Sequence, residues 1–144
     1  MEQRTHRLAS ERLVGKPVRI EKNHAEVLLK TTEEMAVDDY GLVHGGFTFG
    51  LADYAAMLAV NEPTVVLGKA EVRFLRPVKA GDELLARAEV TEDLGRKKVV
   101  KAEVFRDEEK VFEGTFTATC LRGTSSDDQN FLSPNIVFRY RCSI

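Results

Sequence analysis

The apolar and polar residues change their period along the chain. Residues 42–60 form an almost wholly apolar run, which is typical of a buried helix. After this run, apolar and polar residues alternate through several segments that short turns separate, and a period of two predicts strands. Because one face of each strand is apolar and the other polar, we expect an antiparallel sheet that is covered on one side.

The strand that follows the apolar run illustrates the pattern. Val66, Gly68, Ala70, Val72 and Phe74 share its inward face. The three later strands place a similar set on the same side: Leu84, Ala86, Ala88, Val90, Val100, Ala102, Val104, Phe112, Phe116, Ala118 and Cys120. Since many of these side chains are small, they leave room for a bulky element, and the apolar helix is the only candidate. We therefore predict an α+β fold in which the sheet wraps around the helix.

The remaining segments complete the predicted organisation. Residues 1–15 form a charged N-terminal segment with a short helix, and residues 16–31 form one strand or a hairpin. Residues 16–122 are expected to be one domain. Residues 123–144 form a C-terminal tail that begins as a polar linker, and its last alternating residues form either an extra edge strand or a frayed end.

Composition narrows the class of protein. A chain of 144 residues fits one domain, and with 43% hydrophobic and 31% charged residues it is expected to be globular. A net charge of -2 gives no reason to expect nucleic acid as a partner. Cys120 and Cys142 do not indicate a disulfide framework, and no apolar leader follows Met1, so we expect a cytosolic protein. Residues 42–60 would be long enough for a membrane span, but Asp53 in the middle disfavours membrane insertion.

Asp53 is the main candidate for chemistry. It is the single carboxylate in the apolar run, and a buried carboxylate is costly unless it is paired, hydrated or used. His44, Gly45 and Gly46 stand where the helix should begin, and a helix start offers free backbone N–H groups and partial positive charge. An electrophilic end followed by an acid on one helix suits attack on a carbonyl group.

Two stretches resemble a known family. Residues 38–46 (DDYGLVHGG), followed by Leu51-Ala52-Asp53, resemble the phenylacetyl-CoA-type acyl-CoA thioesterases of the hotdog fold. Residues 74–82 (FLRPVKAGD) resemble the strand and turn after the helix in the same superfamily. The resemblance covers roughly residues 16–122. It implies a hotdog fold and hydrolysis of an acyl-CoA thioester.

The resemblance also assigns roles to individual residues. The backbone N–H of Gly45 is expected to hold the thioester oxygen, and Asp53 is expected to act as general base or nucleophile. Asp38 takes a position that is usually Asn in the family, and it could share the work, as an acid in that loop does in another branch. Gly45 and Asp53 are eight residues apart, about 12 Å along one helix, which is too far for one carbonyl. We therefore expect a homo-oligomer, a dimer or a dimer of dimers, in which Gly45 of one chain faces Asp53 of the other.

Other residues are expected to contribute to substrate binding. His44 fixes the loop, Gly46 leaves room for the substrate, and Phe47 lines the acyl pocket. Coenzyme A carries phosphates, so cations are expected near the mouth of the site; the candidates are Arg73, Arg76 and Lys79. No metal site is expected, because His6 and His24 have no Cys or acid at ligand spacing. No organic cofactor is needed, since coenzyme A belongs to the substrate.

Two other functions fit parts of the sequence. Residues 72–82 also resemble the hotdog effector domain of acyl-CoA-responsive fatty-acid repressors, which predicts a non-catalytic acyl-CoA sensor. Those repressors carry a DNA-binding domain before the hotdog domain and lack the helix acid, whereas residues 1–15 are too short for such a domain and Asp53 is present. A hydratase or dehydratase would need an Asp and His pair for proton abstraction, and His44 instead falls in the Gly-Gly turn.

Overall fold

One long helix and a curved sheet make up most of the molecule. The computed structural model describes residues 1–121 and 139–142. The elements in chain order are α1 (Glu11–Val14), β1 (Lys16–Glu21), β2 (His24–Lys30), the 3-10 helix η1 (Glu33–Met35), α2 (Gly45–Val60), β3 (Val65–Phe74), β4 (Glu83–Leu94), β5 (Lys97–Arg106), β6 (Glu109–Cys120) and β7 (Arg139–Cys142). Residues 16–31, expected to be a strand or a hairpin, are the hairpin β1–β2.

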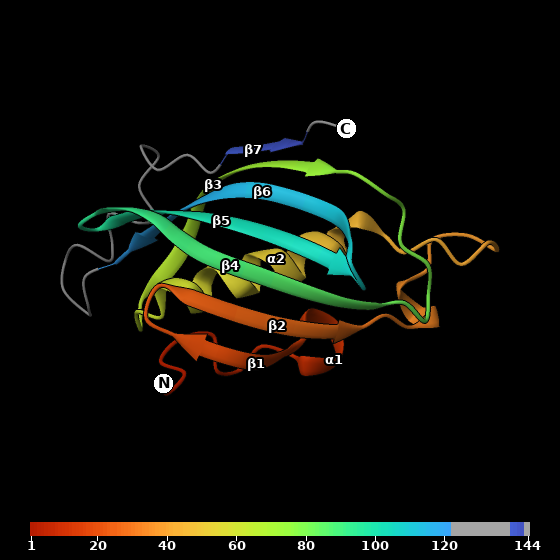
Figure 1. The fold of residues 1–144 in the computed structure, drawn as a ribbon, viewed down its shortest axis with the longest axis horizontal. Helices are drawn as coiled ribbons and strands as arrows, with labels where there is room; N and C mark the ends of the chain where they lie inside the picture. The colour runs from red at the N-terminus through yellow and green to blue at the C-terminus, as the bar shows by residue number, and fades with distance from the viewer. Residues whose placement is uncertain (122–138, 143–144) are drawn as a thin grey trace.

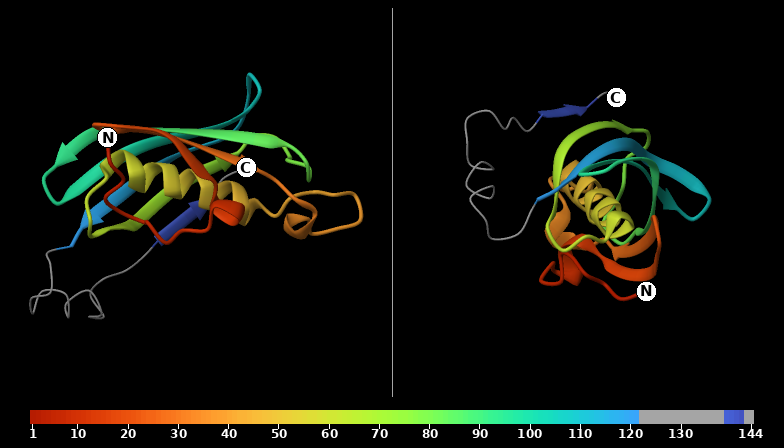
Figure 2. Two further views of the ribbon diagram at one scale, coloured as in Figure 1. Left: turned by 90° about the horizontal axis from the view of Figure 1, so that it is seen from below. Right: turned by 90° about the vertical axis from the view of Figure 1, so that its left-hand side faces the viewer.

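The sheet wraps around α2. Its strand order is β1-β2-β4-β5-β6-β3-β7, and every pair is antiparallel except β3 with β7. Figure 1 shows α2 behind the strands, and the view along the helix in Figure 2 shows the strands curving around it. This arrangement confirms the predicted α+β hotdog fold.

Small side chains on the inner face allow the helix to approach the sheet. Ala86, Ala88 and Ala102 are at most 1% exposed, on the two strands that lie against α2 together with β2. Along β4 the residues between them are exposed or half-buried, as the alternation predicts. The alternating pattern therefore buries the helix and the inner face of the sheet in one core.

The first strand after the helix differs from the prediction. Val66 was expected on the inward face, but Val65 is buried and Val66 pairs with Thr119 on the outward face. The register shifts between Leu67 and Lys69, so Gly68 is the extra residue of a β-bulge. The bulge reverses the alternation, and from Ala70 onward the inward positions are those predicted.

The N-terminal segment is bound to the far end of α2. The helix ends at Asn61, which adopts a left-handed conformation (φ 52°) and donates its backbone N–H to Met57 O. Asn61 Oδ1 accepts from the backbone N–H of Arg4 at 2.7 Å, and Asn61 Nδ2 donates to Glu2 O at 2.8 Å. Gln3 Nε2 lies 3.0 Å from the Tyr54 hydroxyl. The first residues thus pack along the helix, and the expected short helix is the single turn α1.

The C-terminal tail contributes one described element. Strand β7 pairs in parallel with β3, with Lys69 opposite Arg139 and Val72 opposite Cys142. The predicted linker at residues 123–130 lies outside the described residues. In Figure 1, β7 lies beside β3 at one edge of the sheet.

Candidate functional site

His44 caps the start of α2. Its Nδ1 accepts a hydrogen bond from the backbone N–H of Gly46 at 2.9 Å. This contact requires Nδ1 to be unprotonated, so the neutral ring carries its proton on Nε2. The ring also meets Phe47 edge-on, with the centroids 6.2 Å apart. His44 therefore accepts the hydrogen bond of the Gly46 N–H group at the first turn of α2.

The backbone N–H of Gly45 is left without a partner. Gly45 is the first residue of α2, and the first N–H groups of a helix have no carbonyl acceptor within the helix. Among residues 1–121 and 139–142, no hydrogen bond uses this group. A Cβ atom at this position would lie 3.0 Å from Cε1 of Phe74, which is tighter than most real contacts. Glycine therefore keeps the space next to this free donor open.

A cavity of about 290 Å³ opens beside this donor. Its lining comes from the loop before α2, the first turn of α2, the end of β3 and the turn after it: Val43, Gly45, Thr48, Phe74, Leu75, Arg76, Pro77 and Val78. Most of these side chains are apolar. The amide of Gly45, the hydroxyl of Thr48 and the guanidinium of Arg76 are the exceptions. Apolar walls with a few placed polar groups are typical of small-molecule sites.

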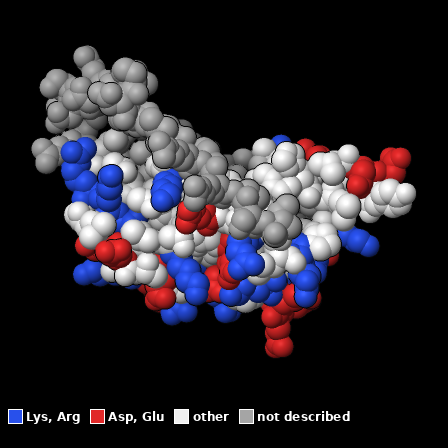
Figure 3. Space-filling model, turned by 90° about the horizontal axis from the view of Figure 1, so that it is seen from above, with Lys and Arg blue, Asp and Glu red and all other residues white. Residues whose placement is uncertain are grey.

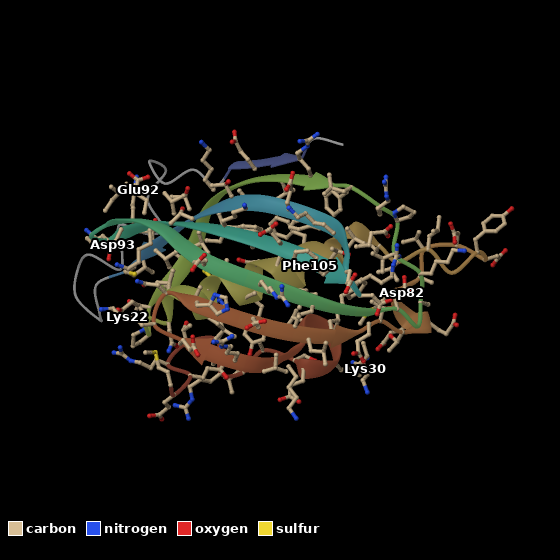
Figure 4. The ribbon with its side chains drawn as sticks, viewed as in Figure 1. Lys22, Lys30, Asp82, Glu92, Asp93 and Phe105 are labelled. Atoms are coloured by element: carbon tan, nitrogen blue, oxygen red, sulfur yellow. The ribbon has the colours of Figure 1, made fainter. Side chains whose placement is uncertain are left out.

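The turn after β3 is held against the loop before α2. Val43 donates its N–H to Val78 O, and Ala80 donates its N–H to Gly41 O, each at 2.8 Å. Figure 4 shows Asp82 at the end of the sheet where the turn after β3 meets the loop before α2. Asp82 Oδ2 and the carbonyl of Pro77 each accept from Arg106 Nη1 at 2.9 Å. The rim of the cavity is therefore fixed by hydrogen bonds on both sides.

Asp53 lies further along α2 and does not line this cavity. The residue is half-buried, and its Oδ1 atom is buried with no hydrogen-bond partner among the described residues. Burial disfavours the charged carboxylate and raises the pKa of Asp53 from 3.8 to about 6. Gly45 and Asp53 both lie in α2, so the eight-residue spacing corresponds to about 12 Å along the helix axis. A carboxyl group held in this way is suited to accept a proton near neutral pH.

Asp38 has a role in the loop before α2. Its Oδ1 accepts from the backbone N–H groups of Tyr40 at 3.0 Å and Leu42 at 3.1 Å. Asp38 is exposed and does not line the cavity. One of its oxygens therefore shapes the loop as an Asx-type turn.

The expected cations are distributed unevenly around the cavity. Arg76 lines it, and its Nε is 3.9 Å from a carboxylate oxygen of Glu109. Arg73 lies outside the lining, and its Nη1 atom is 3.8 Å from Oε1 of Glu113. Lys79 is exposed and also lies outside the lining. Figure 3 shows basic and acidic side chains mixed over one face of the molecule.

The structure thus brings together some of the predicted residues. Gly45 and Arg76 share the cavity; Asp38, Phe47 and Asp53 do not line it. Sequence reasoning did not single out Thr48, although a polar residue one turn after Gly45 in an apolar run was an available signal.

Metal sites and membrane-spanning helices are both absent from the described part of the chain. There, no group of three or more His, Cys, Asp and Glu side chains is placed to hold a metal ion. In the same residues, none of the helices combines the length and apolar character that crossing a bilayer requires.

Comparison with protein families and sequences finds one family. Residues 40–113, about half of the chain, match the thioesterase superfamily. Methylthioribose-1-phosphate isomerase of Aquifex aeolicus is 59% identical over 121 residues, which are 84% of this chain and 26% of that protein. Transcription factor FapR of Caldanaerobacter subterraneus is 31% identical over 94 residues, 65% of this chain and 47% of that protein. The chain therefore spans about a quarter of the length of the isomerase and about half of the length of FapR.

Solved structures extend the comparison. Uncharacterized protein PH1136 from Pyrococcus horikoshii is 66% identical, with a TM-score of 0.84 over 85% of this chain and 94% of that one. PaaI from the phenylacetic acid degradation operon of E. coli is 28% identical, with a TM-score of 0.71 over 78% and 83% of the two chains. The smu.793 protein of Streptococcus mutans, solved with bound acetyl CoA, is 28% identical, with a TM-score of 0.67 over 74% and 87%.

Proposed function

The chain belongs to the thioesterase superfamily, and we propose that it hydrolyses an acyl-CoA thioester to a free acid and CoA. The observation that carries the proposal is Asp53, whose Oδ1 atom is buried without a hydrogen-bond partner in the described residues and whose pKa is raised to about 6. A second observation supports it, since the unpaired N–H of Gly45 borders an apolar cavity.

Gly45 supplies the donor for the developing oxyanion. Attack on a thioester carbonyl places negative charge on its oxygen, and a preorganised N–H group at a helix start stabilises that charge. The N–H of Gly45 has no partner in the described residues and can take this role, whereas the neighbouring N–H of Gly46 donates to His44. Loss of one such donor typically lowers the rate about a hundred- to thousand-fold.

Asp53 supplies the base or the nucleophile. With a pKa of about 6 it is mostly ionised at neutral pH, yet basic enough to take a proton from water. As a base it removes a proton from the water that attacks the carbonyl carbon, and the thiolate of CoA leaves. As a nucleophile it attacks the carbonyl carbon and forms an anhydride with the acyl group while the thiolate of CoA leaves, and water then hydrolyses the anhydride. The reaction needs no metal ion and no organic cofactor.

We propose that each site is shared between two copies of the chain. Gly45 and Asp53 of one helix are about 12 Å apart and cannot meet at one carbonyl. A two-fold pairing of α2 helices brings Gly45 of one copy to Asp53 of the other and forms two equal sites. The protein is therefore proposed to act as a homodimer or as a dimer of dimers.

The other expected residues take supporting roles. Arg76 at the cavity and the more distant Arg73 and Lys79 are proposed to attract the phosphates of coenzyme A. Phe47 packs against His44 and supports the first turn. Asp38 is proposed to position the loop through its two backbone contacts rather than to accept a proton.

Similar proteins support an acyl-CoA substrate. The smu.793 structure contains acetyl CoA, and PaaI comes from a phenylacetic acid degradation operon. We propose that this chain handles a related thioester, of the type expected from the resemblance to phenylacetyl-CoA thioesterases. The isomerase activity of the Aquifex relative is not carried over, because the matching segment is 26% of that protein.

A non-catalytic acyl-CoA sensor is the alternative. The 31% identity to transcription factor FapR favours this function. A sensor needs the cavity but has no use for a costly unpaired carboxyl group, so Asp53 separates the two proposals.

A thiol-release assay tests the proposal. The wild-type protein is incubated with acyl-CoA substrates of several chain lengths and with aromatic ones. We expect CoA release that Asp53→Asn lowers by about a hundred-fold or more, while the matched loop variant Asp38→Asn retains it. Tight binding of acyl-CoA with no release would favour the sensor, and loss of release in Asp38→Asn alone would place the catalytic acid in the loop.

Mixed oligomers test the sharing of the site. Gly45→Ala and Asp53→Asn are inactive alone, and co-expression pairs an intact Gly45 with an intact Asp53 in half of the sites of each mixed dimer. Random pairing then restores about a quarter of the wild-type activity. No recovery in a preparation shown to contain mixed dimers would contradict the shared site, as would full activity in a proven monomer.

A further inference from the structure

The cavity beside Gly45 is lined by the hydroxyl-bearing residue Thr48, which the proposed reaction leaves unused. Thr48 lines the cavity and is only 3% exposed. In the described residues its hydroxyl has no hydrogen-bond partner. The Thr48 Oγ1 atom is not among the buried unpartnered side-chain atoms of the described residues, so it is accessible from the cavity. A ligand oxygen placed there can therefore become its hydrogen-bond partner in place of water.

Thr48 and Gly45 point to one bound group. Gly45 and Thr48 are three residues apart at the start of α2, which places them on the same face of the helix and about 4.5 Å apart along its axis. Both line the same cavity. A ligand that places its thioester oxygen on the Gly45 N–H therefore presents its next few atoms to the Thr48 hydroxyl.

The other walls restrict what can bind there. Val43, Phe74, Leu75 and Val78 are apolar, and Arg76 is exposed at the rim. Thr48 is therefore the polar side chain available inside the cavity. A volume of about 290 Å³ has room for roughly ten water-sized groups, which fits a short acyl chain.

The one-turn spacing of Gly45 and Thr48 favours a ligand with a second oxygen on carbon 3 of its acyl chain. In an acyl thioester, an oxygen on carbon 3 lies about 3–5 Å from the carbonyl oxygen, depending on the torsion angles. A hydroxyl group both donates and accepts, so Thr48 can pair with either a 3-hydroxy or a 3-keto oxygen. An unsubstituted alkyl chain fills the same space and leaves the Thr48 hydroxyl unpaired.

We propose that Thr48 is a specificity residue that selects short acyl-CoA thioesters carrying an oxygen on carbon 3. This inference rests on the proposed function for the orientation of the substrate, with its carbonyl oxygen on Gly45. Sites that hydrogen-bond a substrate oxygen discriminate against analogues that lack it more strongly than apolar pockets discriminate between chain lengths.

Matched substrates and an isosteric variant test the proposal. We compare kcat/KM for 3-hydroxybutyryl-CoA, as both enantiomers, with kcat/KM for butyryl-CoA. The wild-type protein is expected to prefer one enantiomer by about tenfold over butyryl-CoA. Thr48→Val replaces the hydroxyl with a methyl group and is expected to bring this ratio close to one, whereas Thr48→Ser is expected to keep it.

Binding measurements separate this inference from the proposed reaction. The same pair is prepared as analogues in which a methylene group replaces the thioester sulfur, and their Kd values are measured by calorimetry. If no thioester is hydrolysed but the wild-type protein binds the hydroxylated analogue about tenfold more tightly, the hydrolase proposal fails and the role of Thr48 stands. A ratio near one for the wild type in both assays would overturn the role of Thr48. Equal losses for both ligands in Thr48→Val, or a Thr48→Ser variant that behaves like Thr48→Val, would overturn it as well.

Discussion

Replacing Asp53 with asparagine is expected to stabilise the folded protein at neutral pH while it removes activity. The Oδ1 atom of Asp53 is buried and has no hydrogen-bond partner in the described residues, and this burial raises the pKa of the carboxyl group to about 6. The folded protein therefore binds a proton more tightly here than the unfolded chain does. Its contribution to stability is fully present below pH 3.8 and is lost as the pH rises through about 6.

The size of the effect follows from the two pKa values. With 3.8 for the unfolded chain and about 6 for the folded protein, ionisation of Asp53 costs less than about 1 kcal/mol at pH 4, about 2 kcal/mol at pH 5 and about 3 kcal/mol at pH 7. Asparagine has a similar shape and no charge, so the variant avoids this cost. Its advantage in the free energy of unfolding should grow by roughly 2 kcal/mol between pH 4 and pH 7.

Urea unfolding at several pH values measures this advantage. The wild-type protein and Asp53→Asn are unfolded at half-unit steps from pH 4 to pH 8, and their free energies of unfolding are subtracted. Asp39→Asn is the matched control, because Asp39 is an exposed acid in the loop before α2. The pH dependence of the difference for Asp53→Asn is judged against that of this control. A flat difference for Asp53→Asn, or a wild type more stable than the variant at pH 7, would refute the reasoning about burial.

Three further predictions concern activity and the start of α2. If Asp53 acts as base or nucleophile, kcat/KM should rise about tenfold per pH unit below about pH 6 and level off above it; a profile with no inflection between pH 5 and pH 7 would contradict that role. Gly45→Ala should lower kcat/KM by about a hundred-fold or more, because the new Cβ meets Phe74 beside the free N–H; an unchanged rate in a folded variant excludes this donor. His44→Ala should lower the free energy of unfolding by about 1 kcal/mol, because it removes the acceptor for the Gly46 N–H group. His44→Asn should retain most of this stability, since asparagine also caps a helix start. Equal losses in both variants would argue against capping.

Much of the fold could be predicted from periodicity. The alternation in β4 and β5 and the alanines on their inner faces indicated a sheet wrapped around an apolar helix. Each of these features is local in the sequence. The bulge at Gly68 was not predicted, because it depends on how β3 pairs with β6. Glycine allows a bulge but does not require one, so the reversal at Val66 could not be read from β3 alone.

The candidate site was less accessible to sequence reasoning. Gly45 and Asp53 stood out because each is unusual where it lies in the chain. The cavity joins residues separated by some thirty positions. The position of Thr48 one turn after Gly45 is visible in the sequence, but the cavity that both residues line depends on the fold. Asp38 was considered as a catalytic acid, and its contacts with Tyr40 and Leu42 depend on the backbone of the loop.

The parallel strand at the border of the sheet bears on assembly. Strand β7 takes the backbone groups that β3 would otherwise offer to a neighbour. Two strands cannot occupy one border, so a second molecule could extend the sheet there only by displacing Arg139–Cys142. A four-residue parallel ladder is a weak competitor, since parallel pairing is slightly less stable per residue than antiparallel pairing. Association through this border and docking of the chain's own last strand are thus mutually exclusive, and protein concentration would set the balance between them.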